Sequence, residues 1–142
     1  MHPDESCEAF IDGASSGNPG PSAYAYIIKR GGEALRGNGY LGPGTNNQAE
    51  YEALVHCLRR ALRLGCRNII VYSDSTLLVK QLRGEYNVRE QRLRRLREEA
   101  LNLINNFDSF EIRHIPRELN SEANNLARRG LRKAARVGGG VD

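Results

Sequence analysis

The sequence of 142 residues has few cysteines, no long apolar run and no signal-like start. Cys7, Cys57 and Cys66 are an odd number without metal-ligand spacing, and the apolar neighbours of Cys57 and Cys66 predict buried free thiols. No run approaches the about 20 apolar residues that cross a bilayer, so no membrane helix is expected. The opening MHPDESCEAF lacks the basic and apolar segments of a signal peptide, which favours the reducing cytoplasm.

Composition favours one globular domain, because hydrophobic residues make up 39% and charged residues 27% of the chain. We expect this domain to span residues 1–136 and the glycine-rich segment 137–142 to be a flexible tail. The net charge of +4 alone is compatible with simple solubility. Basic residues nevertheless cluster at 89–97, and again at 128–136, where no acid is present, which favours a polyanionic partner. Nothing predicts an obligate protein partner, and we expect a monomer.

The hydrophobic pattern predicts strands and helices in the order βββαβααβα. Strands are expected at 7–12, 23–29, 33–41, 68–72 and 110–115. Helices are expected at 45–64, from about 76 to 84, at 91–105 and from 120 onward, with Thr45 and Asn120 as caps. Three meander strands followed by strands joined through helices give an α/β fold with a mixed sheet. The continuous apolar run NIIVY predicts that its strand is buried on both faces.

Three carboxylates stand where solubility does not explain them. Asp12 and Asp74 each end a strand, and Glu50 lies in the first turns of a capped helix. Each alone has an ordinary explanation, as a turn residue or a helix-surface acid. Together they would repel one another in this fold unless a cation neutralised them, and hard oxygen ligands select Mg²⁺ or Mn²⁺.

At this point the residues resemble a known family. FIDGASSGNPGPSAYAYII, TNNQAEYEAL, IIVYSDSTLLVKQL and HIPRELNSEANNLARR are similar to the successive motifs of type 1 ribonuclease H, over about residues 8–130. The resemblance implies a ribonuclease H-like fold with a five-stranded mixed sheet flanked by helices. It also implies an endonuclease that hydrolyses the RNA strand of an RNA–DNA hybrid with two Mg²⁺ ions, or Mn²⁺, and leaves 5′-phosphate and 3′-hydroxyl ends.

The resemblance also implies site residues. Asp12, Glu50 and Asp74 match metal-binding carboxylates of the catalytic site, and Asn124 occupies the position of the fourth. Polar positions match those that contact the hybrid in its minor groove, where the 2′-hydroxyls identify RNA: Asn18, Asn46, Asn47 and Gln48. Thr45 matches a position that binds a phosphate of the DNA strand, although a cap alone explains it equally well.

Asn124 is a departure from the family pattern, which has an acid there. An amide oxygen can ligate Mg²⁺ but carries no charge, and neither Glu122 nor Asn125 points the same way around a helix. Three interpretations stay open: an active natural variant, an engineered substitution, or a natural module that binds hybrid or double-stranded nucleic acid without cutting it. Another nuclease or a transposase-like protein of this fold is a weaker alternative, because such relatives usually keep only the scattered acids.

Two other departures concern the substrate. The segment 84–93 is too short for the basic protrusion of many bacterial members, so the arginines from Arg89 to Arg97 are expected either to bind substrate or to be a solvated helix face. His114 lies within a strand, outside the loop that carries the family histidine, and is expected to be structural. Arg117 occupies that loop and is predicted to contact substrate.

Overall fold

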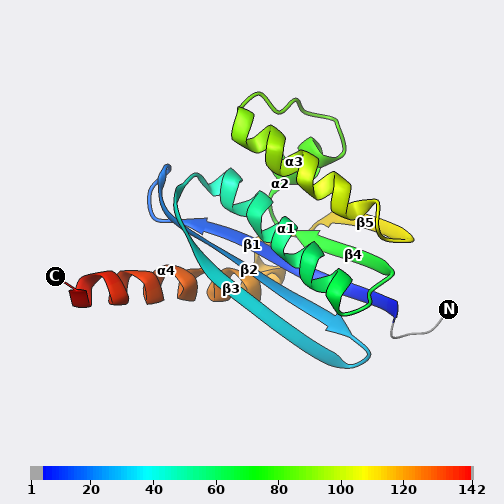
Figure 1. The fold of residues 1–142 in the computed structure, drawn as a ribbon, viewed down its shortest axis with the longest axis horizontal. Helices are drawn as coiled ribbons and strands as arrows, with labels where there is room; N and C mark the ends of the chain where they lie inside the picture. Colours follow the sequence, from blue (N-terminus) through cyan, green and yellow to red (C-terminus); the bar gives the residue numbers. More distant parts are fainter. Residues whose placement is uncertain (1–4, 142) are drawn as a thin grey trace.

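A computed structural model describes residues 5–141, and the side chains among them as far as Lys133 (Figure 1). The strands are β1 (Ser6–Ser15), β2 (Gly20–Arg30), β3 (Glu33–Gly44), β4 (Asn68–Ser73) and β5 (Ser109–His114). The helices are α1 (Asn46–Arg63), α2 (Thr76–Leu82), α3 (Gln91–Ile104) and α4 (Ser121–Val141), and a short 3₁₀ turn, η2, covers Arg117–Leu119. Because α4 continues to Val141, it includes most of the expected tail, whose flexibility stays a prediction.

The sheet has the predicted mixed topology, with strand order β3-β2-β1-β4-β5. Strands β1, β2 and β3 form the antiparallel meander, joined by tight turns. Strand β4 then pairs parallel to β1, and β5 pairs parallel to β4, through connections that contain helices. The element order βββαβααβα is therefore confirmed.

Helices cover the two faces of the sheet unequally (Figure 1). Helices α1, α2 and α3 lie on one face, and the hydrophobic core forms between them and the sheet from residues such as Ile11, Leu54 and Val71. Helix α4 packs mainly across β1, β2 and β3 on the opposite face. No helix within residues 5–141 is long and apolar enough to cross a membrane.

Local signals set the ends of α1. Thr45 caps the helix: its hydroxyl accepts from the backbone N–H of Gln48, while the Gln48 side chain accepts from the backbone N–H of Thr45. This capping box satisfies two backbone donors that would otherwise lack partners. The helix stops before Gly65, whose φ of +87° is a left-handed conformation that side chains disfavour. Both ends agree with the sequence prediction.

The predicted burial of β4 on both faces is wrong. Ile69 and Val71 are buried against the helices, but Ile70 and Tyr72, which point the other way, are only half-buried. The reason is that α4 lies chiefly over the meander, and this leaves the second face of β4 partly open. Phe10 on β1 stacks on Tyr72 there, with the ring centroids 4.9 Å apart. The apolar composition of this strand therefore predicts more burial than the structure shows.

The prediction that Cys66 is a free thiol is also wrong. Cys7 and Cys66 form a disulfide that links β1 to the segment just before β4, across 59 residues of sequence. The parallel pairing of the two strands brings these cysteines together, because Ser6 lies opposite Asn68 and Cys7 opposite Ile69. Cys57 is free and buried in α1, as expected. Burial raises the pKa of its thiol to about 12.

Candidate active site

Asp12 and Asp74 meet because β1 and β4 run in parallel. The register places Ile11 opposite Ser73 as the last pair between these two strands, so Asp12 and Asp74, which follow them, lie side by side. Asp12 lies within β1 and is buried, with 5% of its surface exposed, whereas Asp74 follows the end of β4 and is half-buried. The expectation that Asp12 ends its strand is wrong, because β1 continues to Ser15 in its pairing with β2. The two carboxylates nevertheless meet where the pairing of β1 with β4 stops.

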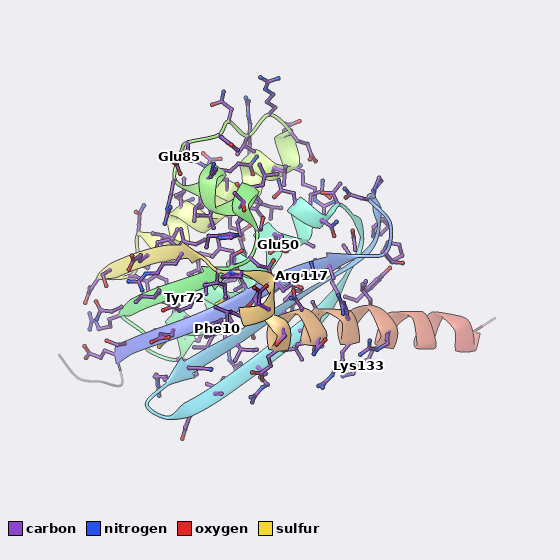
Figure 2. All side chains as sticks on the ribbon, turned by 180° about the vertical axis from the view of Figure 1, so that it is seen from behind. Phe10, Glu50, Tyr72, Glu85, Arg117 and Lys133 are labelled. Atoms are coloured by element: carbon purple, nitrogen blue, oxygen red, sulfur yellow. A yellow bond between two sulfur atoms is a disulfide. The ribbon has the colours of Figure 1, made fainter. Side chains whose placement is uncertain are left out.

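Glu50 joins them from α1, which crosses β1 at very close range. The cause is Gly13: a Cβ at this position would lie 2.3 Å from both the carbonyl carbon of Ala49 and the backbone nitrogen of Glu50. Only glycine permits that approach of helix to strand. Glu50 is buried with 7% of its surface exposed, and Figure 2 shows it between the sheet and the helices.

The three carboxylates form one cluster. Each of Asp12, Glu50 and Asp74 offers an oxygen atom, and these atoms all lie within 4.8 Å of one another. Within the described residues, this is the group of acids, cysteines and histidines close enough to hold a metal ion. The convergence expected from the sequence is therefore present.

Crowding and burial disturb the ionisation of the cluster. Burial, followed by the charge of Asp74, raises the pKa of Asp12 from 3.8 to about 7. Burial, followed by the charge of Asp12, raises the pKa of Glu50 well above its usual 4.5. A hydrogen bond between Asp12 and Glu50 and the nearby charges of Arg117 and Arg128 lower the pKa of Asp12 in part. The cluster thus holds negative charge reluctantly without a cation.

Asn120 ties the cluster to the sheet. Its side-chain Nδ2 donates to the backbone oxygen of Ile11 at 2.8 Å and to Oδ2 of Asp74 at 3.0 Å. The sequence predicts that the Asn120 side chain caps α4. It does not, because its Oδ1 has no hydrogen-bond partner. Only the backbone oxygen of Asn120 takes the capping position, accepting from the N–H of Asn124. The N-cap pattern was correct, but the amide is committed to the carboxylate.

Asn124 lies one helical turn beyond Asn120, with 5% of its surface exposed. Its Oδ1 is buried and has no hydrogen-bond partner. Four and seven residues further along α4, on the same side of the helix, Arg128 and Leu131 line the hollow that contains the acids. A buried oxygen without a partner is costly, so this position is suited to a ligand that supplies the missing contact.

The acids lie in a hollow of about 690 Å³. Its rim carries several side chains predicted to contact substrate, namely Asn18, Asn46, Asn47 and Arg117. Its other polar lining residues include Ser15, Ser16, Ser75 and Arg128. The three predicted carboxylates thereby share one hollow with four of the predicted substrate residues, whereas Asn124 is not among the residues that line it.

Three predicted substrate residues lie outside this lining: Thr45, Gln48 and Arg89. Thr45 caps α1, and Gln48 is buried. The Gln48 Nε2 donates to Glu90 at 2.6 Å, and its Oε1 accepts from Arg92 at 3.3 Å. Arg89 is exposed in the loop before α3. Gln48 therefore links the start of α1 to that loop.

The amides on the rim are ordered by one another. Ser15 donates to Oδ1 of Asn46 at 2.8 Å, and the backbone N–H of Asn46 donates to Oδ1 of Asn18 at 3.0 Å. The Nδ2 of Asn47 donates to Gln81 at 3.2 Å, while its Oδ1 is buried without a partner. These contacts join the β1–β2 turn to the start of α1, so the rim has a defined shape.

A larger hollow, of about 1030 Å³, lies along the open face of the sheet. It is lined by mixed charges such as Glu8 and Lys29 together with Ile70. No carboxylate triad was found there among the described residues. The chemistry, and not the size of the cavity, therefore identifies the smaller hollow as the candidate active site.

Asn120 and Arg128 are the site residues that sequence reasoning missed. Asn120 was interpreted only as a cap, and Arg128 only as a member of a basic cluster. The signal for both was their spacing from Asn124, four residues before it and four residues after it, which places all three on one side of a helix.

Comparisons with known proteins agree with this fold and site. A family model described as reverse transcriptase-like matches residues 10–130. The ribonuclease HI of Halobacterium salinarum is 42% identical over 125 residues, which are 87% of this chain and 63% of that protein. The chain thus spans less than two thirds of the length of the first curated relatives it matches, and about a third of the mycobacterial ones.

Solved structures give the same result. The crystal structure of ribonuclease H1 from Halobacterium salinarum superposes with a TM-score of 0.86 at 40% identity, covering 90% of this chain and 98% of that one. The structure of LC11 ribonuclease H1 in complex with an RNA/DNA hybrid gives a TM-score of 0.85 at 32% identity, covering 91% and 99%. Because the family model matches residues 10–130 and the chain covers nearly all of these two solved chains, it belongs to the ribonuclease H family.

Proposed function

We propose that this chain is an endonuclease that hydrolyses the RNA strand of RNA–DNA hybrids and leaves 5′-phosphate and 3′-hydroxyl ends. The observation that carries the proposal is the meeting of Asp12, Glu50 and Asp74 within 4.8 Å, in a hollow rimmed by amides and arginines. A relative of the same fold was solved with an RNA/DNA hybrid, which supports this choice of substrate.

The donor set suits hard divalent cations. The ligand oxygens are mutually repelling carboxylates with raised pKa values, and Glu50 Oε2 and Asn124 Oδ1 are buried without partners. Asp12, Glu50 and Asp74 would hold two Mg²⁺ ions, or Mn²⁺, and Asn124 would add a neutral oxygen ligand. Bound there, such ions lower the pKa of a water molecule and stabilise negative charge on a leaving oxygen.

Residues around the acids have separate proposed roles. Asn18, Asn46 and Asn47 contact sugar edges in the minor groove, where the 2′-hydroxyl distinguishes RNA from DNA. Arg117 binds a phosphate close to the cut. Thr45, Gln48 and Arg89 stay predicted contacts outside the hollow, with Thr45 on a phosphate of the DNA strand. Asn120 orients Asp74, since it donates directly to that carboxylate.

A cleavage assay tests the function. The purified chain is mixed with a hybrid labelled on its RNA strand, with Mg²⁺, Mn²⁺ or EDTA. We expect cuts in the RNA strand with either ion and none with EDTA. Double-stranded DNA and double-stranded RNA of the same sequence serve as substrate controls. An intact hybrid after incubation with both ions, with folding verified by circular dichroism, would refute the proposal.

The second candidate is a module that binds hybrid or double-stranded nucleic acid without cutting it. The observation that favours it is Asn124, a neutral amide where the family pattern has an acid. Against it stand the three acids of the cluster, which a binder of a polyanion would have no reason to keep. Binding of hybrid without cleavage, followed by cleavage after Asn124→Asp, would establish this candidate.

We also propose a monomer acting in the cytoplasm. The Cys7–Cys66 disulfide opposes that location, because a reducing compartment keeps most cysteine pairs as thiols. Counting free thiols in protein purified with thiols blocked at lysis decides the matter. One free thiol per chain would argue for an oxidising compartment, and three would argue for the cytoplasm.

A further inference from the structure

The stretch of α4 from Arg128 to Lys133 is strongly basic. Its four cationic side chains are all exposed, and no acid lies between Glu122 and Asp142. None of the ion pairs found among residues 5–141 involves these cations: Arg128, Arg129, Arg132 and Lys133. Four neighbouring cations outside any of these ion pairs repel one another, so the surface is suited to an anionic partner.

This stretch adjoins the acidic hollow. Helix α4 is held against the meander at Gly130, where a Cβ would lie 3.0 Å from the Cβ of Ala23. Arg128 and Leu131 line the hollow beside Asp12 and Asp74, and the charge of Arg128 lowers the pKa of Asp12. From there α4 extends past the edge of the sheet, as Figure 1 shows. The basic stretch therefore continues the surface of the site outward.

Helical geometry divides the four cations into two pairs. Arg132 follows Arg128 by four residues, only about 40° further around the helix, and the two form a ridge on the side of the hollow. Arg129 and Lys133 lie about 100° and 140° from Arg128 and form a flank that faces away from it. Figure 2 shows Lys133 below α4, whereas Glu50 and Arg117 lie above it.

We propose that the Arg128–Arg132 ridge binds backbone phosphates of a nucleic-acid duplex that lies over the acidic hollow. The proposal rests on the proposed function in taking this duplex to be the RNA–DNA hybrid. Two observations identify the occupant: the ridge is positively charged, and it continues the lining of the hollow. A duplex over the hollow brings its phosphates close to the acids, and cations beside the acids offset the repulsion between these two sets of negative charges. The ridge would supply the grip that the short loop before α3 lacks.

Two double variants with the same change of charge test the ridge. Arg128→Gln with Arg132→Gln removes the ridge, and Arg129→Gln with Lys133→Gln removes the flank. Glutamine has nearly the helix propensity of the residues replaced, so α4 should persist in circular dichroism. Both pairs are made in the full chain carrying Asp74→Asn, so that a fluorescent hybrid is not cut while its anisotropy is measured over a series of KCl concentrations.

Loss of the ridge should raise Kd for the hybrid by about tenfold or more near 0.1 M KCl. It should also reduce the slope of log Kd against log [KCl] by about 1.8, since each phosphate contact contributes about 0.9. Loss of the flank should change the slope by less than half as much. Equal effects of the two pairs, or an unchanged slope without the ridge, would overturn the proposal.

The two proposals fail in different ways. If the parental chain does not cut hybrid, the proposed function is lost, but the ridge is still judged from binding alone. If the parental chain cuts hybrid and the two pairs bind equally, the ridge is rejected and the nuclease stands. The four cations of α4 would then affect hybrid binding only through the net charge of the protein.

Discussion

The two ends of the β1–β4 pair are held together in opposite ways. At one end Cys7 and Cys66 form a covalent link beside the apolar core. At the other end Asp12 and Asp74 lie side by side, and Glu50 adds a third carboxylate. The first end stabilises the fold, while the second destabilises it until a cation arrives. The comparison shows that one strand pair both stabilises the fold, through the disulfide, and positions the acids of the candidate active site.

The largest effect is expected at the acidic end. Asp74→Asn should lower kcat for hybrid cleavage by about 1000-fold or more, about 4 kcal/mol of transition-state stabilisation, because a charged ligand is lost. The asparagine oxygen still accepts from Asn120, so the fold should survive and gain stability in EDTA as repulsion falls. Steady-state cleavage and urea unfolding measure the two effects.

Asp108→Asn is the control for this variant. Asp108 is exposed and paired with Arg67 at 3.3 Å, and it does not belong to the acidic cluster. Both measurements should therefore stay at the parental values. Substantial cleavage by Asp74→Asn would contradict the assignment of the acidic end as the active site.

The next effect is expected at the disulfide end. Cys66→Ser should lower the free energy of unfolding by about 2–4 kcal/mol, because a link across a long loop restricts the unfolded chain. Cleavage below the unfolding transition should change little. Urea unfolding with and without a reductant measures this difference: the reductant should destabilise the parental chain and leave Cys66→Ser unaffected. A reductant-insensitive parental protein would show that this end is not linked in solution.

A pH series separates the two ends without mutation. Asp12 has its pKa raised from 3.8 to about 7, so the folded chain binds the proton more tightly than the unfolded chain. The resulting stability is present below pH 4 and is lost as the pH rises through 7, with a slope of at most about 1.4 kcal/mol per pH unit for this group. Glu50 contributes with the same sign.

Urea unfolding in EDTA between pH 5 and 8 measures this loss, and Asp12→Asn should flatten the profile. Added Mg²⁺ should restore stability mainly at the upper end of the range, where the carboxylates are charged. A metal-free protein that becomes more stable from pH 5 to 8 would contradict the sign of the raised pKa.

The smallest effect is expected for Asn124→Asp. A fourth charge should increase the affinity for Mg²⁺ by about tenfold, about 1.4 kcal/mol, and lower stability in EDTA by a similar amount. Calorimetric titration with Mg²⁺ measures the first change and urea unfolding the second. Asn125→Asp on the exposed side of α4 is the matched control. Identical metal affinity in the two variants would exclude Asn124 from the metal site.

Much of this molecule could be predicted from local patterns. The capping box at Thr45 and the glycine at position 65 fixed the ends of α1 because capping depends on neighbouring residues only. The strand order and the meeting of Asp12, Glu50 and Asp74 followed from the element sequence together with the family motifs. The identity of the ions, the role of Asn124 and the contacts of Arg89 are not tested by the structure and stay predictions.

What could not be predicted depends on which elements pack together. The Cys7–Cys66 link needs the register of β1 and β4, and the half-open face of Ile70 and Tyr72 needs the position of α4. The Asn120 side chain binds Asp74, and only its backbone oxygen caps α4; sequence spacing does not distinguish these two uses of the amide. The role of the arginines on α3 could not be predicted either, because it depends on the segments that pack beside them. Arg94 and Arg97 donate to backbone oxygens of neighbouring segments.

The absent side chain at Gly13 has a consequence for how the site is held in shape. Since main chain rests directly on main chain between β1 and α1, this contact sets the separation of the backbones that carry Asp12 and Glu50. The elements that carry these two acids are therefore held in place by the fold, which reduces the backbone movement that metal binding would require. In a nuclease built this way, a side chain at position 13 would push apart the elements that carry two proposed metal ligands, although position 13 itself supplies no ligand.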